Sequence, residues 1–264
     1  MEDANKKRGT FVDSQIQEVI NQKRNVNKPI KHLSRQGPIF MPPLFYCCLL
    51  ESDSDEKYYF TAAKRLIELG ASLTHQTKFF DYKINVLDIA GYNKFPGKQI
   101  PSYILQTLDS IKKRELLDGI VSHSLYTALC KVILLENIDF AHFLILNGAS
   151  VNIRDKDGGT PIFHALKIED KDLRLKALSF IEMFGIDLTI ENKNNETILD
   201  CCSKQKLEDE KNLITKILQE RTNRWNLFKQ LAHNSESYIS KIPKELVFLT
   251  GNYILHCDHL KGVR

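Results

Sequence analysis

The sequence predicts an all-α protein in which helix pairs stack into a solenoid, and three observations lead to this fold class. An amphipathic helix pattern ends at Gly148. A polar turn through Asp157-Gly158 then leads into Thr160-Pro161. Related segments recur along the chain at a period of about 33 residues, with insertions. This period is typical of stacked two-helix units, none of which can bury its apolar faces alone.

Each part of this joint has a local physical reason. Glycine readily takes the left-handed conformation that ends a helix, so Gly148 is expected just past a helix end. Asp157-Gly158 suits a tight turn that needs positive φ. Thr160 suits a helix N-cap, and Pro161 suits the first helical position. One helix pair is therefore predicted to end at Gly148 and the next to begin at Thr160.

The N-terminal part of the chain predicts a capping helix and a first helix pair. Residues 11–23 carry apolar side chains at helical spacing, and Asp13-Ser14 are suitable cap residues. Residues 1–37 are therefore expected to cap the array and lead into it. The first pair opens at Pro42-Pro-Leu-Phe45 and ends near Gly70.

The second and third helix pairs differ in regularity. The second opens at Asn85-Val-Leu-Asp-Ile-Ala90, but no glycine stop follows its second helix at Ile104-Leu-Gln-Thr-Leu108. Its two helices are separated by a long stretch, residues 92–101. The third opens at Thr127-Ala-Leu-Cys130 and reaches Gly148 at the spacing of one uninterrupted helix pair.

Two further pairs complete the array. The fourth has its second helix from Leu173 to Phe184, ending at Gly185. The fifth opens at Glu196-Thr-Ile-Leu-Asp200 and closes with the amphipathic run Leu213 to Leu218. Residues 222–264 follow the array and predict a C-terminal helical cap.

Over residues 38–221 these motifs resemble the ankyrin-repeat family, with about five repeats. The resemblance implies a curved solenoid that binds a protein partner through its β-turn fingers and concave helix face. It also implies that Asp88 and Asp200, which stand at the histidine position of the repeat's Thr-Pro-Leu-His motif, bond backbone in the adjoining turn. His164 and His142 are assigned structural or surface roles.

Composition predicts a cytoplasmic monomer with neither membrane nor nucleic-acid binding. The 264 residues are 42% hydrophobic and 27% charged, with a net charge of +4, and basic residues are interspersed with acids. No run approaches the roughly 20 apolar residues of a membrane span, and the first residues do not resemble a secretory signal.

The chemistry-bearing residues predict neither an enzyme nor a metal site. The chain contains no phosphate-binding glycine loop, nucleophile elbow or zinc-protease motif. Only His256-Cys-Asp-His259 approaches a zinc-ligand spacing, and no second ligand pair accompanies it. No cofactor is expected. Six cysteines are predicted to be buried thiols in a reducing compartment: Cys47, Cys48, Cys130, Cys201, Cys202 and Cys257.

The predicted partner-binding residues lie on three fingers. The finger between Leu73 and Asn85 carries several aromatic side chains, and exposing them together in water is unfavourable unless something covers them. They either contact a partner or fold back over the irregular second repeat. The fingers are expected to line one side of the solenoid. The predicted binding residues are Phe79, Phe80, Tyr82, Arg154, Asp155, Lys156, Asn192, Lys193 and Asn194.

Two more specific biological roles are implied by weaker resemblances. Residues 242–254, Ile-Pro-Lys-Glu-Leu-Val-Phe-Leu-Thr-Gly-Asn-Tyr-Ile, resemble the F-box-like ends of poxviral ankyrin proteins, which implies an adaptor for a cullin-type ubiquitin ligase. The divergent repeats and the Lys-, Asn- and Ile-rich composition resemble ankyrin effectors that intracellular bacteria such as Legionella deliver into host cells. That setting implies action in the host cytosol.

Overall fold

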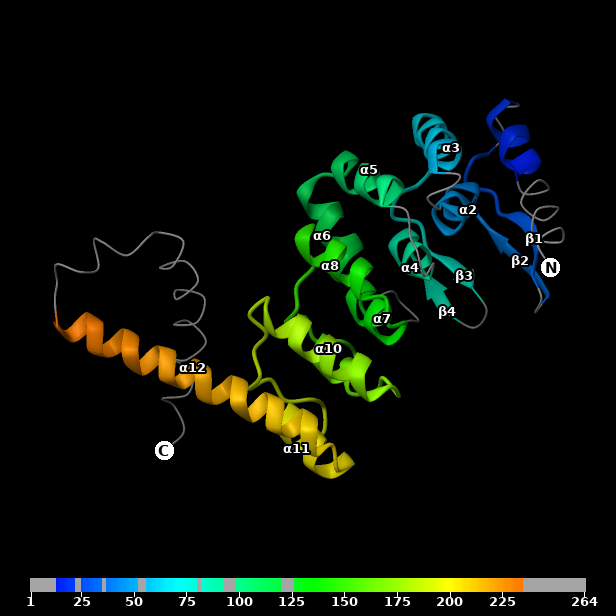
Figure 1. The fold of residues 1–264 in the computed structure, drawn as a ribbon. Helices are drawn as coiled ribbons and strands as arrows, with labels where there is room; N and C mark the ends of the chain where they lie inside the picture. Colours follow the sequence, from blue (N-terminus) through cyan, green and yellow to red (C-terminus); the bar gives the residue numbers. More distant parts are fainter. Residues whose placement is uncertain are drawn as a thin grey trace. The chain divides into compact units, whose positions relative to one another are not determined.

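The computed structural model describes residues 13–21, 25–34, 37–51, 56–79, 82–92, 98–119 and 126–234. The chain forms two compact units, residues 1–157 and 158–264. Helices dominate the described residues, as predicted, and two short antiparallel β-hairpins accompany them (Figure 1). None of the helices in these ranges combines the length and apolar character that crossing a membrane requires.

The first unit begins with the predicted helix and a hairpin that was not predicted. Residues 13–21 are helical, and Ile16 is fully buried. Strand β1 (Ile30–Ser34) pairs with β2 (Gly37–Met41). The Tyr46 hydroxyl donates a hydrogen bond to the carbonyl of Ile39 at 2.9 Å, which ties β2 to the next helix.

The first helix pair lies where the sequence predicts it. Helix α2 (Pro43–Leu50) is buried from Pro43 to Cys48, and α3 (Glu56–Glu68) packs against it. Gly70 has a φ of +91° just after α3, in the left-handed region that the predicted stop requires. These boundaries confirm the predicted opening and end of this pair.

The second pair starts with a hairpin and ends with an additional helix. Strands β3 (Thr77–Phe79) and β4 (Tyr82–Ile84) precede α4 (Val86–Gly91) and α5 (Gln99–Thr107). Helix α6 (Ser110–Asp118), which was not predicted, follows where other pairs have a glycine stop. The Asp109 side chain starts α6 by accepting hydrogen bonds from the backbone N–H groups of Ile111 and Lys112.

The third pair confirms the predicted joint. Thr127 caps α7 (Ala128–Leu134) by accepting a hydrogen bond from the N–H of Cys130 at 3.3 Å. Helix α8 (Ile138–Leu146) follows, and Gly148 has a φ of +103°. The N–H of Ala149 donates to the carbonyl of Leu144, a backbone bond typical of a glycine-ended helix.

The described part of the second unit, residues 158–234, contains two helix pairs: α9 (Pro161–Ala165) with α10 (Lys171–Glu182) and α11 (Ile198–Gln205) with α12 (Glu208–Asn234). Thr160 is the N-cap of α9 and Pro161 its first residue, as predicted, although the Thr160 side chain makes no cap hydrogen bond. Helix α12 is continuous for 27 residues and extends past position 222, where the predicted C-terminal helical cap begins.

The left-handed conformation of Gly148 leads to a stability prediction. A Cβ atom at this position would meet no atom within 4 Å, so the cost of a side chain comes from the backbone conformation alone. We expect Gly148→Val to lower the free energy of unfolding by about 1–2 kcal/mol. Gly148→Asn is the matched control, because asparagine tolerates this conformation better. Equal urea midpoints for the valine variant and the wild type would contradict the assigned helix end.

The described cysteines are free and buried, as predicted: Cys47, Cys48, Cys130, Cys201 and Cys202. Cys257 lies outside the described residues. Burial raises the pKa of the Cys202 thiol to about 12 and that of Cys47 further, so the reactive thiolate is scarce at neutral pH. We expect these five thiols to resist N-ethylmaleimide in the folded protein and to react in denaturant. Mass spectrometry showing rapid native labelling of all five would contradict their burial.

Candidate protein-binding surface

Three loops that precede or follow the repeat helices are candidate binding elements, and each is described within its own unit. We call residues 74–85 the aromatic finger, residues 150–157 the charged finger and residues 191–197 the asparagine finger. The first two belong to the first unit and the third to the second unit.

The aromatic finger is the hairpin formed by β3 and β4. Phe79 is directly opposite Tyr82 in the register, and Phe80 lies outside the described residues. The hairpin is anchored at its base, where Thr77 and Ile84 face each other and are both buried. Asn85 then caps α4, because its side chain accepts hydrogen bonds from the N–H groups of the first turn.

The charged finger presents two cations on a hydrogen-bonded turn. Arg154 and Lys156 are exposed. Asp155 between them is buried, and its carboxylate accepts a hydrogen bond from the N–H of Asp157 at 2.8 Å. The base of the finger is held by Asp118 of α6, which accepts from the N–H of Ser150 at 2.9 Å. Asp155 therefore shapes the turn, whereas Arg154 and Lys156 are exposed to solvent.

In the asparagine finger, the half-buried side-chain amide of Asn192 organises the loop through its hydrogen bonds. The Asn192 side-chain oxygen accepts hydrogen bonds from the N–H groups of Asn194 and Glu196, at 2.8 and 3.1 Å. Asn195 completes the turn with a φ of +56°. Lys193 and Asn194 are exposed at the tip. Asn192 therefore holds the loop in this conformation, and the polar side chains of Lys193 and Asn194 are exposed to solvent.

Glu196 at the end of this finger gives the second unit an acid-sensitive contact. Its carboxylate is bonded by Lys204 and by the Asn192 amide, and these bonds lower its pKa to about 2. A carboxylate whose pKa is lowered in the folded state stabilises the fold at pH values above its unfolded pKa of about 4.3. This stabilisation is lost as the pH falls towards 2 and the carboxylate becomes protonated. We expect Glu196→Gln to lower the thermal midpoint at pH 7 and to change it little near pH 2.

The control for this prediction is Glu169→Gln, which removes a negative charge at an exposed position of the same unit. Circular dichroism melts over this pH range give both results. A Glu196→Gln effect that is the same at pH 7 and pH 2 would show that the carboxylate charge has no role.

The two aspartates at the histidine position of the repeat motif do what the sequence predicts. Asp88 accepts a hydrogen bond from the N–H of Asn85 at 2.8 Å, and Asp200 accepts one from the N–H of Thr197 at 2.8 Å. Each carboxylate therefore fixes the turn that starts its own helix. His164 is buried in α9, and His142 is exposed on α8.

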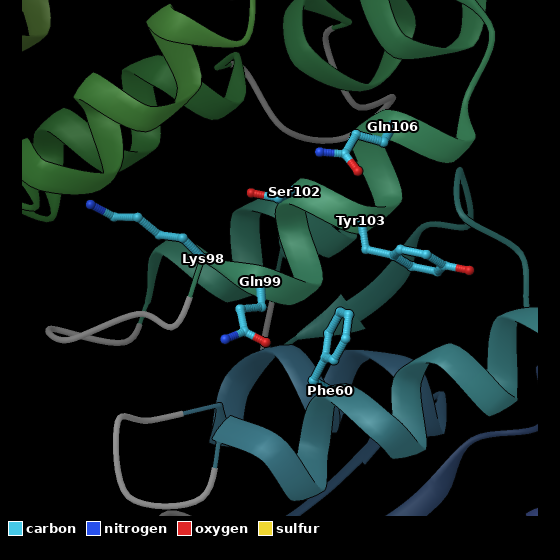
Figure 2. A pocket seen from close by; sticks show the side chains of 6 residues that line it. All are labelled: Phe60, Lys98, Gln99, Ser102, Tyr103 and Gln106. Carbon is cyan, nitrogen blue, oxygen red and sulfur yellow. The ribbon is translucent and has the colours of Figure 1, made fainter.

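A shallow hollow of about 350 Å³ lies between α3 and α5 (Figure 2). Phe60 and Tyr103 meet edge to face there, with ring centroids 5.8 Å apart. Its six lining residues offer polar and aromatic contacts and include no carboxylate, imidazole or thiol: Phe60, Lys98, Gln99, Ser102, Tyr103 and Gln106.

Comparison with known proteins supports the repeat assignment in the centre of the chain. Residues 127–184 match the family model described as ankyrin repeats (many copies). The match begins at the N-cap of α7 and ends two residues after α10, so it covers the charged finger and the helix pairs on either side of it. No curated protein matches the chain. This segment is similar to ankyrin repeats, which in general mediate protein–protein interactions.

One exposed feature was missed by the sequence analysis. Phe40 on β2 is 52% exposed, and Lys31 on β1 lies directly opposite it. The only available signal was the turn-favouring Gly37-Pro38 between two short runs that contain apolar residues. That pattern is too short to predict a hairpin or to say which side chains face solvent.

Proposed function

We propose that the chain is a non-enzymatic module that binds a protein partner through its fingers and the concave helix face of its repeats. The observation that carries this proposal is the charged finger. It lies inside the segment similar to ankyrin repeats and presents Arg154 and Lys156 on a turn closed by the buried Asp155. Arginine is enriched among the residues that dominate interface energies.

The fixed conformation of the charged finger supports a binding role, in addition to its charge. A loop already held in one conformation loses less entropy when a partner docks, so its contacts contribute more to affinity. In the charged finger, the N–H groups of Ser150 and Asp157 provide that order by donating hydrogen bonds to the carboxylates of Asp118 and Asp155. Asn192 provides it in the asparagine finger, whose Lys193 and Asn194 are the proposed contacts.

The test is affinity capture from mammalian cytosol with quantitative mass spectrometry. We expect the double variant Tyr82→Ala/Arg154→Ala to lose the specifically enriched protein while its unfolding midpoint stays nearly unchanged. The matched control is Lys176→Ala, which removes an exposed cation from α10. Loss of stability without loss of capture would show that the two finger residues are structural.

The ligase-adaptor and effector roles are hypotheses that rest on sequence resemblance. The F-box-like pattern at residues 242–254 lies outside the described residues, and so does the zinc-like spacing at residues 256–259. Copurification of a cullin adaptor that depends on residues 242–254 would distinguish a ligase adaptor from a plain binding module. We also propose, from the sequence, a monomer in the cytoplasm, or in the host cytosol if the chain is a delivered effector.

A further inference from the structure

We propose that the hollow between α3 and α5 binds an extended, acidic, proline-containing segment of a protein partner. We call this surface the α3–α5 hollow and define it by its six lining residues. The two helices are the second helices of the first and second pairs, whereas each finger precedes the first helix of a pair. The hollow is therefore a binding surface in addition to the fingers.

The lining residues form one continuous surface. Those on α5, at positions 99, 102, 103 and 106, follow the spacing i, i+3, i+4 and i+7, which places them on one side of the helix. Phe60 reaches them from α3, and its ring meets that of Tyr103 with the centroids 5.8 Å apart (Figure 2). Both rings are half-buried, so part of each one is open to a ligand.

Two glutamines of the hollow favour an extended peptide. Gln99 and Gln106 are exposed, and neither side chain is hydrogen-bonded within the described part of the chain. Each side-chain amide offers both a donor and an acceptor. An extended segment has backbone N–H and C=O groups free for such amides, whereas a helical segment bonds most of its own internally.

The aromatic pair favours proline as the apolar anchor of this segment. Proline-rich segments in the polyproline II conformation dock in grooves lined by aromatic side chains. This conformation has no internal hydrogen bonds, so its carbonyl groups are free to accept from the amides of Gln99 and Gln106. Phe60 and Tyr103 provide the aromatic surface beside these amides.

The charge around the hollow favours an acidic segment. Lys98 is the one charged lining residue. Lys57 and Lys64 stand three residues before and four residues after Phe60, so both lie on the same side of α3 as that ring. All three lysines are exposed, and none forms an ion pair with another residue that the structure describes. Carboxylates on the partner would complement them.

A peptide fits the hollow better than a single-stranded nucleic acid does. Nucleic acids of this kind are held by aromatic rings whose faces stack on successive bases. Phe60 and Tyr103 instead pack edge to face against each other, with an angle of 86° between the ring planes. The two rings therefore do not form a platform for consecutive bases.

The probe is a short fluorescein-labelled peptide in which two prolines are flanked on both sides by Glu and Asp, titrated at low salt by fluorescence anisotropy. We expect Lys98→Glu to weaken its binding about tenfold. The control Lys28→Glu, the same charge change at an exposed position before β1, should have little effect. Gln106→Ala should weaken binding about fivefold, and Gln76→Ala is its control at another exposed position. Unfolding midpoints should stay unchanged, because all four side chains are exposed.

Several results would overturn the inference. These are no measurable binding of the peptide, equal losses for Lys98→Glu and Lys28→Glu, and equal losses for Gln106→Ala and Gln76→Ala. Equal binding of a matched peptide with Ala in place of both prolines, or tighter binding of oligo-dT, would also reject it. The capture experiment tests the fingers separately, because Arg154 does not line the hollow.

Discussion

Lys131→Met is expected to lower the free energy of unfolding by about 3–5 kcal/mol, because it leaves a buried carboxylate without its cation. Lys131 Nζ on α7 donates to Asp88 Oδ2 on α4 at 2.6 Å, and the Asp88 side chain is fully buried. The contact joins the second predicted repeat to the third. Urea unfolding measures the loss.

This loss should depend on pH in a defined direction. Burial raises the pKa of Asp88, and Lys131 opposes that effect, so removing Lys131 raises the pKa further. A folded-state pKa above the unfolded value of about 3.9 favours the fold at low pH and disfavours it as the pH rises through the folded value. The defect of Lys131→Met is therefore expected to be largest near neutral pH and to shrink in acid.

Two controls separate this buried pair from surface charge. Adding Asp88→Asn to Lys131→Met should recover part of the loss, because an asparagine oxygen can still accept from the N–H of Asn85. Lys112→Met removes a cation from an exposed pair with Asp109 and should change stability by no more than about 1 kcal/mol. A Lys131→Met loss as small as that of Lys112→Met would contradict the buried ion pair.

Arg174→Met is expected to have a comparable effect in the second unit, again about 3–5 kcal/mol. Arg174 Nε donates to Glu210 at 2.7 Å, and its Nη1 donates to the carbonyl of Ile168 at 2.6 Å. Both side chains are almost fully buried, so the variant leaves a charge and a carbonyl without their donor. The pair holds α10 and the loop before it against α12.

Arg224→Met is the matched control for Arg174→Met, since Arg224 contacts Glu220 on the exposed side of α12. Chemical unfolding followed by far-ultraviolet circular dichroism compares the two. Similar midpoints for both variants would show that Arg174 contributes no more than a surface arginine.

The ends of the helices were the part of the fold most accessible from sequence. Thr127, Gly148 and Thr197 stand at the predicted positions because caps and left-handed glycines act on the few residues next to them. The capping role of Asp88 also followed from its place in the repeat motif. The central match to ankyrin repeats lies where these local signals are most regular.

Contacts between distant segments could not be read from the sequence. The partner of Lys131 is 43 positions away, and that of Arg174 is 36 positions away, so neither pair leaves a local pattern. Helix α6 occupies the place where other pairs have a glycine stop, and Asp109 is its N-cap. A single aspartate is a weak signal for a helix start, because many loops contain one. Asp155 was grouped with exposed charges because sequence does not show that its carboxylate turns inward to its own loop.

Lysine footprinting of the complex tests the central claim most directly. The captured partner is added, exposed lysines are acetylated, and protection is read by mass spectrometry. The account predicts protection of Lys156 and Lys193 on the fingers, with Lys176 on α10 and Lys216 on α12 still modified; all four are exposed in the free chain. Protection confined to Lys176 and Lys216 would contradict binding through the fingers.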